Sequence, residues 1–438
     1  MVEARRRLIL FARYPIAGKV KTRLIPALGP EGAAALHRRL VFRALRTAHE
    51  ACRTAPAELA VHFDGGTEQA MSHWLGEGAR FVSQAAGDLG ERMASAFEGS
   101  FRTGSTATVI IGSDCPALSP DIVIEAFARL KETPVVFGPA QDGGYYLIGL
   151  SQPMPGLFRG IRWGTDRVLA DSLAVLQRQS CKAALLTPLP DIDRPEDLPH
   201  WNGIAASEDA CLDRVSVIIP ALDEEHHIAA MLRAVRQCTP HEVIVVDGGS
   251  SDATAQCAKE AGATVLTSKP GRARQMNAGA VRAEGGALLF LHADTLLAPG
   301  WAEAVSRTLR APRIAAGAFR FRIAGNFRGK SFIEWSTGIR SRWMQRPYGD
   351  QGLFLTRVLF EEMGGFADLP IMEDYEFAQR LRRRGRIVTV DEPALTSGRR
   401  WQKLGVLRTT LRNQWMLAGY HLGVSPRKLA ACYRAARG

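Results

Sequence analysis

The sequence has no run of 18 or more uninterrupted apolar residues, so it predicts no membrane-spanning helix. Near the start, only residues 8–12 form an apolar run, which is too short for a signal peptide and lacks a convincing cleavage site. The 7 cysteines never occur in Cys-x-x-Cys spacing, which argues against a disulfide framework or a zinc knuckle and predicts reduced thiols. These absences indicate a cytoplasmic protein.

Low-complexity segments are also missing, and the composition excludes disorder for most of the chain. The 438 residues are 46% hydrophobic and 23% charged, the balance of a globular protein with a sizeable core. This length favours two large domains.

Acidic residues are absent after Glu392, whereas basic residues accumulate there and place much of the net charge of +12 at the end of the chain. Apolar residues recur among them at helical spacing. The basic residues are Arg399, Arg400, Lys403, Arg408, Arg412, Arg427, Lys428, Arg434 and Arg437, and the apolar ones are Trp401, Leu404, Leu407, Leu411, Trp415, Leu417, Tyr420 and Leu422. Two interpretations stay open: a basic amphipathic tail in peripheral contact with the inner face of a membrane, or a tail whose apolar side packs on the domain.

The charge also suits a nucleic-acid-binding or membrane-binding protein built on inactive nucleotide folds. We expect no specific nucleic-acid partner. Loss of affinity with salt would identify such a protein, whereas loss of turnover in an Asp294→Ala variant would identify an enzyme.

Two successive halves each alternate between strand and helix patterns. The region between them, residues 201–213, has no strong periodicity, so we predict domains over residues 1–203 and 214–438. Strands are expected at residues 7–12, 107–112, 215–220, 242–247 and 287–292, and helices near residues 30–51 and 120–131. This alternation predicts an α/β protein with mostly parallel, doubly wound sheets and ligand sites at the carboxyl ends of the strands.

In the second half, carboxylates follow neighbouring strand ends. Glu224 lies in the segment that begins at Pro220, and Asp247 ends the next strand, directly before Gly248. Carboxylates can accept hydrogen bonds from a nucleobase or ribose, and glycine permits close approach of the backbone. Asp252, in the same loop, could equally be a helix N-cap.

Phosphate-binding and metal-binding chemistry follows along the chain. Residues 271–279 supply two guanidinium groups and two amides beside a helix start, a composition suited to a diphosphate. The strand after them ends in His-Ala-Asp, and Asp294 has the position and chemistry of a ligand for a divalent cation. Further on come Gly-Asp-Gln-Gly at residues 349–352 and the acidic pair Glu373 and Asp374.

This ordered set resembles family 2 glycosyltransferases of the GT-A fold, and the resemblance covers essentially the whole second half. It implies that Asp374 is the catalytic base, with Glu373 beside it, and that Asp294 binds Mg²⁺ or Mn²⁺ on the diphosphate of a nucleoside diphosphate sugar. The implied donor site consists of Pro220, Glu224, Asp247, Gly271, Arg272, Gln275, Asn277, Asp294 and Gln351. Direct displacement by an acceptor hydroxyl, with a base and a stabilised leaving group, would invert the anomeric carbon.

Two departures refine this expectation. His292 stands where the family usually has an acid, and only residues 399–401 are similar to the Gln-x-x-Arg-Trp motif of processive synthases, so we expect single sugar transfer. The motifs together resemble bacterial glycosyltransferases named for arsenosugar biosynthesis, and similar sequences carry a carotenoid-acid glucosyltransferase label. The acceptor stays open between a small and a lipid-like molecule.

The first half carries four cations directly after its first strand, together with a single Gly18. These are Arg13, Lys19, Lys21 and Arg23, a set that suits a triphosphate or diphosphate. Asp114 follows a strand much as Asp294 does, and Asp193 lies in a later acidic segment. Asp142 and Gly143 form either a plain turn or a substrate loop. We expect Cys115, which has no evident histidine partner, to be a packed thiol rather than a nucleophile.

This half resembles the GT-A-like proteins related to molybdopterin-cofactor and phospholactate guanylyltransferases over nearly all of residues 5–200. The resemblance implies that Asp114 and Asp193 are metal carboxylates and that the four cations face the phosphates of a nucleoside triphosphate. We therefore predict a sugar transferase fused to a nucleotidyltransferase-like module. The alternative is a membrane-associated polyprenyl-phosphate or carotenoid glycosyltransferase with an inactive first half.

Overall fold

The computed structural model describes residues 5–76, 79–209, 211–311, 313–398, 401 and 405–435. The chain forms two compact units, Met1–Ser207 and Glu208–Gly438. This division falls within the region between residues 201 and 213. The α6 helix, Leu198–Asp209, runs across it.

The first unit is built on a seven-stranded sheet in the order β3-β2-β1-β4-β6-β5-β7. Its strands are β1 Arg6–Arg13, β2 Glu58–Asp64, β3 Arg80–Ser83, β4 Ala107–Ile111, β5 Val135–Pro139, β6 Tyr145–Leu150 and β7 Ala183–Leu185. Its other α-helices are α1 Ile25–Thr54, α2 Glu68–Leu75, α3 Leu89–Arg102, α4 Pro120–Arg129 and α5 Val168–Arg178. Short 3₁₀ helices are η1 Thr22–Leu24, η2 Pro155–Phe158 and η3 Pro195–Asp197.

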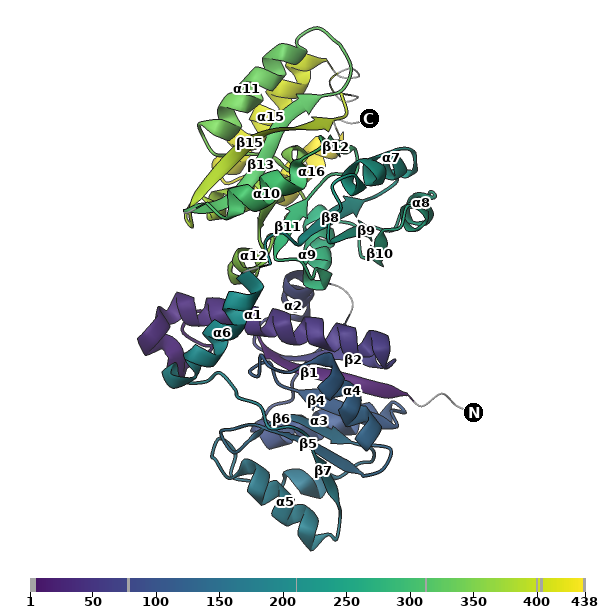
Figure 1. Cartoon of the computed structure of the whole chain (residues 1–438), viewed down its shortest axis with the longest axis vertical. Helices are drawn as coiled ribbons and strands as arrows, with labels where there is room; N and C mark the ends of the chain where they lie inside the picture. The colour runs from purple at the N-terminus through teal and green to yellow at the C-terminus, as the bar shows by residue number, and fades with distance from the viewer. Residues whose placement is uncertain are drawn as a thin grey trace. The chain divides into compact units, whose positions relative to one another are not determined.

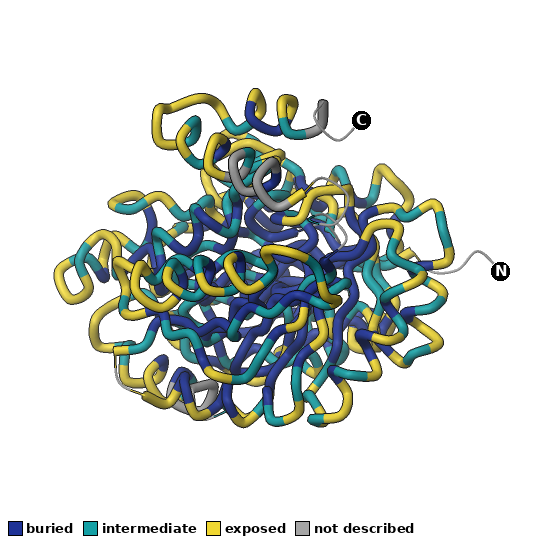
Figure 2. The backbone as a smooth tube through the Cα atoms, turned by 90° about the horizontal axis from the view of Figure 1, so that it is seen from above, coloured by how far each residue is buried: buried dark blue, intermediate teal, exposed yellow. Residues whose placement is uncertain are grey.

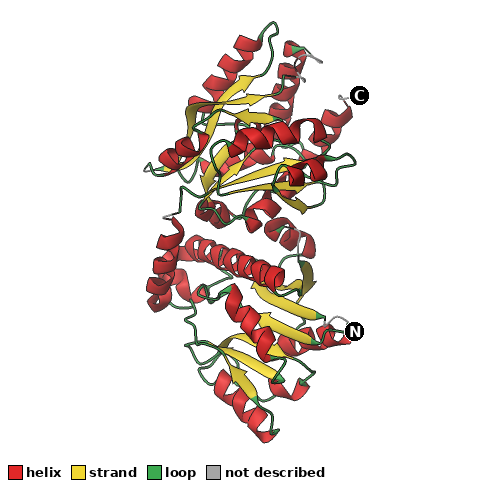
Figure 3. Ribbon diagram, turned by 45° about the vertical axis from the view of Figure 1, so that its right-hand side comes forward, coloured by secondary structure: helices red, strands yellow, loops and turns green. Residues whose placement is uncertain are grey.

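Helices cover both faces of this sheet (Figures 1 and 3), because successive apolar side chains of each strand point to opposite faces. Ile9 and Ile110 point into a core cluster with α3 and α5, whereas the neighbouring residues Leu8 and Leu10 are fully buried on the opposite face. That opposite face is covered by α1 and α4, which pack on each other and on the strands. Two apolar faces of one sheet thus produce the continuous apolar runs seen in the sequence.

The second unit repeats this plan with an eight-stranded sheet in the order β10-β9-β8-β11-β14-β13-β15-β12. Its strands are β8 Val215–Ala221, β9 Glu242–Asp247, β10 Thr264–Thr267, β11 Ala287–Phe290, β12 Thr295–Leu297, β13 Ile314–Ile323, β14 Leu353–Thr356 and β15 Arg386–Thr396. Its helices are α7 Glu225–Arg236, α8 Thr254–Glu260, α9 Arg272–Arg282, α10 Trp301–Leu309, α11 Lys330–Arg342, α12 Arg357–Met363, α13 Glu373–Leu381, α15 Val406–His421 and α16 Pro426–Ala435, with the turn η4 Gly349–Gln351.

Both sheets are parallel in their first half and mixed beyond it. β1 pairs in parallel with β2 and β4, and β8 pairs in parallel with β9 and β11. An antiparallel strand follows in each case, β6 against β4 and β14 against β11, and the second sheet ends in a further antiparallel strand, β12 against β15. The chain thus has two α/β units with mostly parallel sheets, as predicted. In Figure 2 the buried residues lie mainly on the inside of the trace, with exposed residues around them.

The basic end of the chain is helical. Met416 of α15 and Leu429 of α16 are buried, and Tyr375 of α13 bonds to His421 of α15, so part of the apolar side packs on the unit. Trp415 and Leu422 remain exposed. The predicted cations Arg399, Arg400, Lys403 and Arg437 lie outside the described residues, as does Leu404.

Neither a membrane span nor a disulfide is found in the described residues. No described helix combines the length and the hydropathy needed to cross a bilayer. All seven cysteines are free in the structure.

Candidate functional site

The second unit gathers its sequence motifs at one edge of its sheet. Ala221 pairs with Asp247 across β8 and β9, and the Leu291 amide donates to Ile218 at 3.0 Å just beyond β11. Because these strands are parallel, the loops that follow them leave the same edge. The segments containing Glu224, Asp247 and Asp294 are therefore neighbours.

Carboxylates fix the first two of these loops to each other. Asp223, which has φ of 53°, accepts a hydrogen bond from the Ser251 amide at 2.8 Å through Oδ1. The Glu224 amide donates to Thr254 Oγ1 at 2.7 Å, and Asp247 Oδ2 accepts from the Gly249 and Ser250 amides, both at 3.1 Å. Only 5% of Asp247 is exposed. The loops are thus held in one conformation before any ligand arrives.

Asp252 is not itself the N-cap of α8, which is Ala253, but its carboxylate accepts hydrogen bonds at the starts of two helices. Its Oδ1 accepts from the Thr254 amide at 2.9 Å at the start of α8, and its Oδ2 accepts from the Glu225 amide at 3.1 Å at the start of α7. A hydrogen bond from the Thr254 hydroxyl, together with those from the two amides, favours the ionised form and lowers the pKa of Asp252. This carboxylate therefore ties the N-terminal ends of two helices together.

Three predicted donor-binding side chains are turned into the protein. Gln275 Nε2 donates to the carbonyls of Ala221 and Val246 at 2.8 Å each. Asn277 bonds to both the amide and the carbonyl of Phe366, at 2.9 and 3.0 Å, and Gln351 Nε2 donates to the Phe319 carbonyl at 3.0 Å. All three side chains are buried. The structure assigns them to positioning the loops of the site.

An arginine and a buried carboxylate face each other beside these loops. The helix α9 begins after Gly271, whose φ of 145° suits glycine, and places Arg272 with its guanidinium 3.5 Å from Glu373 Oε1. The Glu373 side chain is 5% exposed, whereas that of Arg272 is 48% exposed. Burial raises the pKa of Glu373, and Arg272 opposes that rise. The guanidinium can therefore reach a ligand while its carboxylate partner stays inside.

Asp374 is anchored at the start of α13. Its Oδ2 accepts from the Gly349 amide and its Oδ1 accepts from the Tyr375 amide, both at 2.7 Å. A Cβ at Gly349 would lie 2.7 Å from His292 Nε2 and 3.3 Å from Asp374 Oδ2. Gly349 therefore fits between the two side chains, so the end of β11 meets the start of α13.

Metal ligands in this unit are few. In the described part of the chain, no group of three or more His, Cys, Asp and Glu side chains has the arrangement of a metal site. Mg²⁺ is often held by one or two carboxylates together with substrate phosphates and water. Asp294, half-buried after β11, fits that role.

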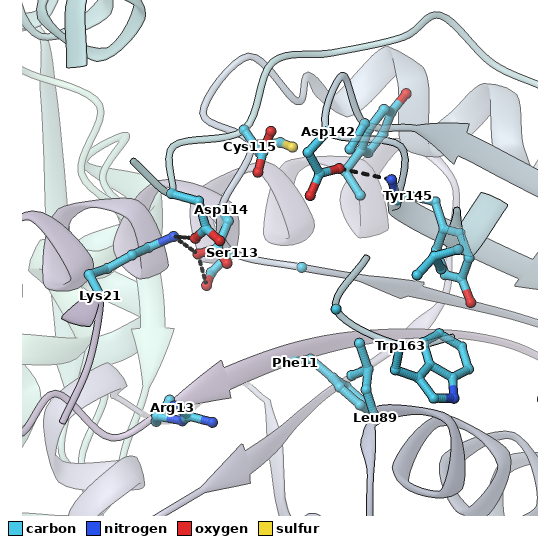
Figure 4. Close-up of a pocket in the computed structure, with 18 of the residues that line it drawn as sticks. Phe11, Arg13, Lys21, Leu89, Ser113, Asp114, Cys115, Asp142, Tyr145 and Trp163 are labelled. Atoms are coloured by element: carbon cyan, nitrogen blue, oxygen red, sulfur yellow. Dashed lines mark hydrogen bonds and ion pairs between the residues drawn. The ribbon is translucent and has the colours of Figure 1, made fainter. Parts of the chain in front are cut away.

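The first unit has a pocket of about 910 Å³ at the carboxyl ends of β1 and β4 (Figure 4). Among the predicted residues, Arg13, Lys21, Arg23 and Asp142 line it, as do Asp114 and Asp193. Lys19 is exposed, and neither it nor Gly143 belongs to the lining. One strand-end pocket thus collects most of the predicted nucleotide-binding set.

Lys21 lies between the two predicted metal carboxylates, and Figure 4 shows it pointing towards Asp114. Its Nζ is 2.7 Å from Asp114 Oδ1, 2.9 Å from Asp193 Oδ1 and 2.7 Å from the Ile192 carbonyl. These acceptors use all three ammonium hydrogens. Burial alone would lower the pKa of Lys21, but the two carboxylates raise it above its ordinary value.

This arrangement alters the expected roles in the first unit. An ammonium group already joins the oxygens that a metal would bridge, so Asp114 and Asp193 do not fit a shared ion in this conformation. Lys21 is 5% exposed and faces carboxylates rather than the open pocket. Arg13 and Arg23, with 54% and 59% of their side chains exposed, remain accessible to an anion.

The Asp142 segment is a turn and also borders the pocket. Asp142 Oδ1 accepts from the Gly144 amide at 2.8 Å, and Gly143 has φ of 88°. A Cβ at Gly143 would lie 2.0 Å from the Asp166 carbonyl oxygen, so the close approach of the next loop requires glycine. The two interpretations drawn from the sequence are therefore compatible.

Several residues of the pocket were not singled out by sequence. Asp64, at the end of β2, bonds to Arg13 at 3.1 Å and to Arg92 at 3.2 Å, and His37 Nε2 contacts the Arg13 carbonyl at 2.9 Å. An acid at a strand end was a usable signal for Asp64, whereas Arg92 and His37 come from helices and had none.

Burial, with repulsion from Asp142, raises the pKa of Asp191 to about 6.

Cys115 is a packed thiol. It is 7% exposed, and burial raises the pKa of its thiol well above the ordinary value. A neutral buried thiol is a poor nucleophile.

Comparison with protein families divides the chain in the same way. Residues 47–165 match a family described as an uncharacterized protein conserved in bacteria (DUF2064), and residues 216–367 match glycosyl transferase family 2. No curated protein matches the chain.

Several solved structures are similar to parts of this chain. A Desulfovibrio desulfuricans protein, provisionally described as a nucleotide-diphospho-sugar transferase, is 33% identical over 45% of this chain and 85% of its own, with a TM-score of 0.42. S. aureus TarS is 17% identical over 42% of this chain and 60% of its own, with a TM-score of 0.35. Glucosyl-3-phosphoglycerate synthase from Mycobacterium tuberculosis, solved with Mn²⁺ and UDP, is 19% identical over 47% of this chain and 80% of its own, with a TM-score of 0.36.

Proposed function

Because residues 216–367 match glycosyl transferase family 2, we propose that the second unit transfers a sugar from a nucleoside diphosphate donor to an acceptor hydroxyl. The observation that carries the proposal is the anchored carboxylate of Asp374. Two backbone amides fix it at 2.7 Å each beside the strand end that bears His292 and Asp294.

Each group has a distinct task in this proposal. Asp374 takes the proton of the acceptor hydroxyl as that oxygen attacks the anomeric carbon, with inversion. Arg272 stabilises the negative charge of the departing diphosphate. Glu224 and Asp247 lie where the nucleoside would bind.

Asp294 would hold Mg²⁺ or Mn²⁺ together with the donor phosphates. Such an ion, when bound, neutralises the charge that develops on the leaving group. Glu373, buried against Arg272, positions that guanidinium.

The test is turnover of nucleoside diphosphate sugars, scored by nucleoside diphosphate release, in the wild type and in Asp374→Asn. Loss of a general base should lower kcat by about 10²- to 10⁴-fold. Donor affinity, measured by calorimetry, should be retained. Full activity of Asp374→Asn would reject its role as base.

Glu376→Gln is the matched control, because Glu376 lies on the same helix but pairs with Arg380 at 2.7 Å. Its kcat should stay within about threefold of wild type, a change below 1 kcal/mol in activation free energy. Equal losses in both variants would indicate damage to α13 rather than loss of a base.

For the first unit we propose a nucleotide-handling module with Arg13 and Arg23 on the phosphates and Asp142 at the edge of the site. The pocket of about 910 Å³ supports this proposal, since its size suits a nucleotide. Binding of nucleoside triphosphates to Asp294→Ala, with and without Arg23→Ala, tests the module apart from the second unit. Unchanged affinity on loss of Arg23 would contradict it.

The acceptor must carry the hydroxyl group that attacks the anomeric carbon. We propose a small or lipid-like hydroxyl compound, as in arsenosugar-type biosynthesis. The alternative is a polyprenyl-phosphate or carotenoid acceptor with an inactive first unit. The two proposals differ in whether the transfer reaction requires detergent or vesicles to present the acceptor.

A further inference from the structure

The helix α11 exposes an apolar stripe. Phe332, Trp335, Ile339 and Trp343 are 57%, 63%, 38% and 84% exposed, and their spacing of three and four residues places them on one side of the helix. Met344 continues the stripe with 48% exposure. Exposed aromatic residues gathered in this way usually mark an interaction surface.

The opposite side of α11 is fastened to the second unit. Ile333, Thr337 and Ser341 are buried, and α11 packs on β13 and β15 (Figure 1). Glu334 accepts from the Ile323 amide at 2.9 Å and pairs with Arg322. The stripe therefore faces away from the unit that carries it.

The charge around the stripe is positive. Residues 325–348 contain five cations, Arg328, Lys330, Arg340, Arg342 and Arg346, and one acid, Glu334. That acid is 10% exposed and is used internally. Arg328 and Arg342 are exposed, Arg342 pairs with Asp391 at 2.5 Å, and the other three cations are half-buried. An anionic surface would thus meet exposed cations alongside apolar rings.

We propose that α11 lies flat on an anionic lipid bilayer with its apolar stripe inserted between the headgroups. Tryptophan and phenylalanine on one side of a helix, with arginine and lysine beside them, are typical of helices that bind at the interface. The helix has 13 residues, about 20 Å, which is too short to cross the roughly 30 Å hydrocarbon core. A second copy of the chain fits less well, because the same cations would repel each other.

The end of α11 adjoins the candidate catalytic loop. The Arg340 guanidinium lies 3.3 Å from the centre of the Tyr348 ring, and Tyr348 directly precedes Gly349, whose amide holds Asp374. If the proposed transferase function holds, a docked α11 would bring this loop to acceptors anchored in the membrane. Docking itself does not depend on that function.

The test is sedimentation of the whole protein, without donor, with vesicles of phosphatidylcholine alone or mixed with phosphatidylglycerol. Wild type should bind only the mixed vesicles, and its binding should weaken as salt is raised. Trp335→Ser with Trp343→Ser should lower the partition coefficient by about tenfold or more, because exposed rings supply the apolar contact. The melting temperature should not change, since neither ring packs in the core.

Trp415→Ser is the matched control, because Trp415 is 77% exposed on α15 in the basic tail. The proposal fails if this control loses binding while the double variant keeps it, or if neutral vesicles bind equally well. It also fails if wild type is a dimer by sedimentation velocity and the double variant is monomeric. Asp374→Asn should bind vesicles like wild type, so an inactive transferase would not be mistaken for a failed docking surface.

Discussion

Asp374 and Gly349 show how a single contact can set the geometry of the candidate base. The carboxylate accepts one bond from its own helix and one from a loop 25 residues away. Both donors are backbone amides, so the anchoring does not depend on flexible side chains. Only the absence of a side chain at Gly349 lets His292 and Asp374 come so close.

We therefore expect Gly349→Ala to lower kcat strongly without unfolding the protein. The added Cβ would lie 2.7 Å from His292 Nε2, so the loop or the imidazole must move and Asp374 loses its fixed position. A misplacement of about 1 Å can cost about 10²-fold in rate. Steady-state kinetics with a circular dichroism melt check this, and a normal kcat would show that the contact is dispensable. Gly338→Ala on α11 is the control, because its Cβ meets nothing within 4 Å.

The carboxyl group of Asp191 predicts a pH effect on the stability of the first unit. Its pKa is raised to about 6 in the folded protein, by burial and by Asp142, from an ordinary value of 3.8. Between these values the folded state binds more protons than the unfolded state, so the free energy of unfolding should fall as pH rises from about 4 to 6.

Asp191→Asn should remove this fall, which we place on the order of 1 kcal/mol because the group is only partly buried. Urea unfolding at pH 4 and pH 7 measures it. Asp142→Asn should weaken the fall without abolishing it. Identical pH profiles for wild type and Asp191→Asn would contradict the assignment.

At the scale of elements, buried amides join helices to the loops of the second unit. Asn277 on α9 pairs with the backbone of Phe366, and Gln275 on the same helix joins the ends of β8 and β9. The sequence pattern suggested donor contacts for these amides. Their burial indicates that they hold the loops that would contact a donor.

Asn277→Ala should accordingly lower the free energy of unfolding by about 2–3 kcal/mol, because it removes two hydrogen bonds to the buried backbone of Phe366. The affinity of the folded variant for the donor should change less than threefold. Chemical unfolding and calorimetry measure the two quantities. A large loss of affinity with normal stability would restore the donor-binding interpretation. Asn326→Ala, at an exposed position of the same unit, should change neither quantity.

At the scale of the whole molecule, the chain repeats one sheet plan in two units with different side-chain chemistry. The first unit places an ammonium group between its strand-end carboxylates, and the second places a fixed carboxylate beside an arginine. The proposal of two working modules in one chain implies that the product of one is concentrated near the other.

We expect two separable ligand responses in thermal unfolding of the intact protein. A nucleoside diphosphate sugar with Mn²⁺ should raise the melting temperature in wild type but not in Asp294→Ala, because specific ligands stabilise the native state. Nucleoside triphosphates should still stabilise Asp294→Ala through the first unit and lose that effect in Arg23→Ala. A single response abolished by Asp294→Ala would leave the first unit without a nucleotide role.

The sequence by itself determined the α/β class, the five strands β1, β4, β8, β9 and β11, and the residue types at their ends. Continuous apolar runs such as residues 242–247 need two covered faces, and a parallel sheet supplies them, so local pattern was sufficient. The family 2 glycosyltransferase resemblance rested on the same local motifs and is confirmed by the family match.

Tertiary structure decided which of these groups meet. Lys21 and Asp193 are 172 residues apart in the sequence, and Asn277 and Phe366 are 89 apart, so no local periodicity could pair them. It also decided which side of α11 is covered, because an amphipathic spacing does not state what lies against the helix. The reason is physical: contacts between distant segments depend on strand order and register, which follow from the packing of the whole sheet.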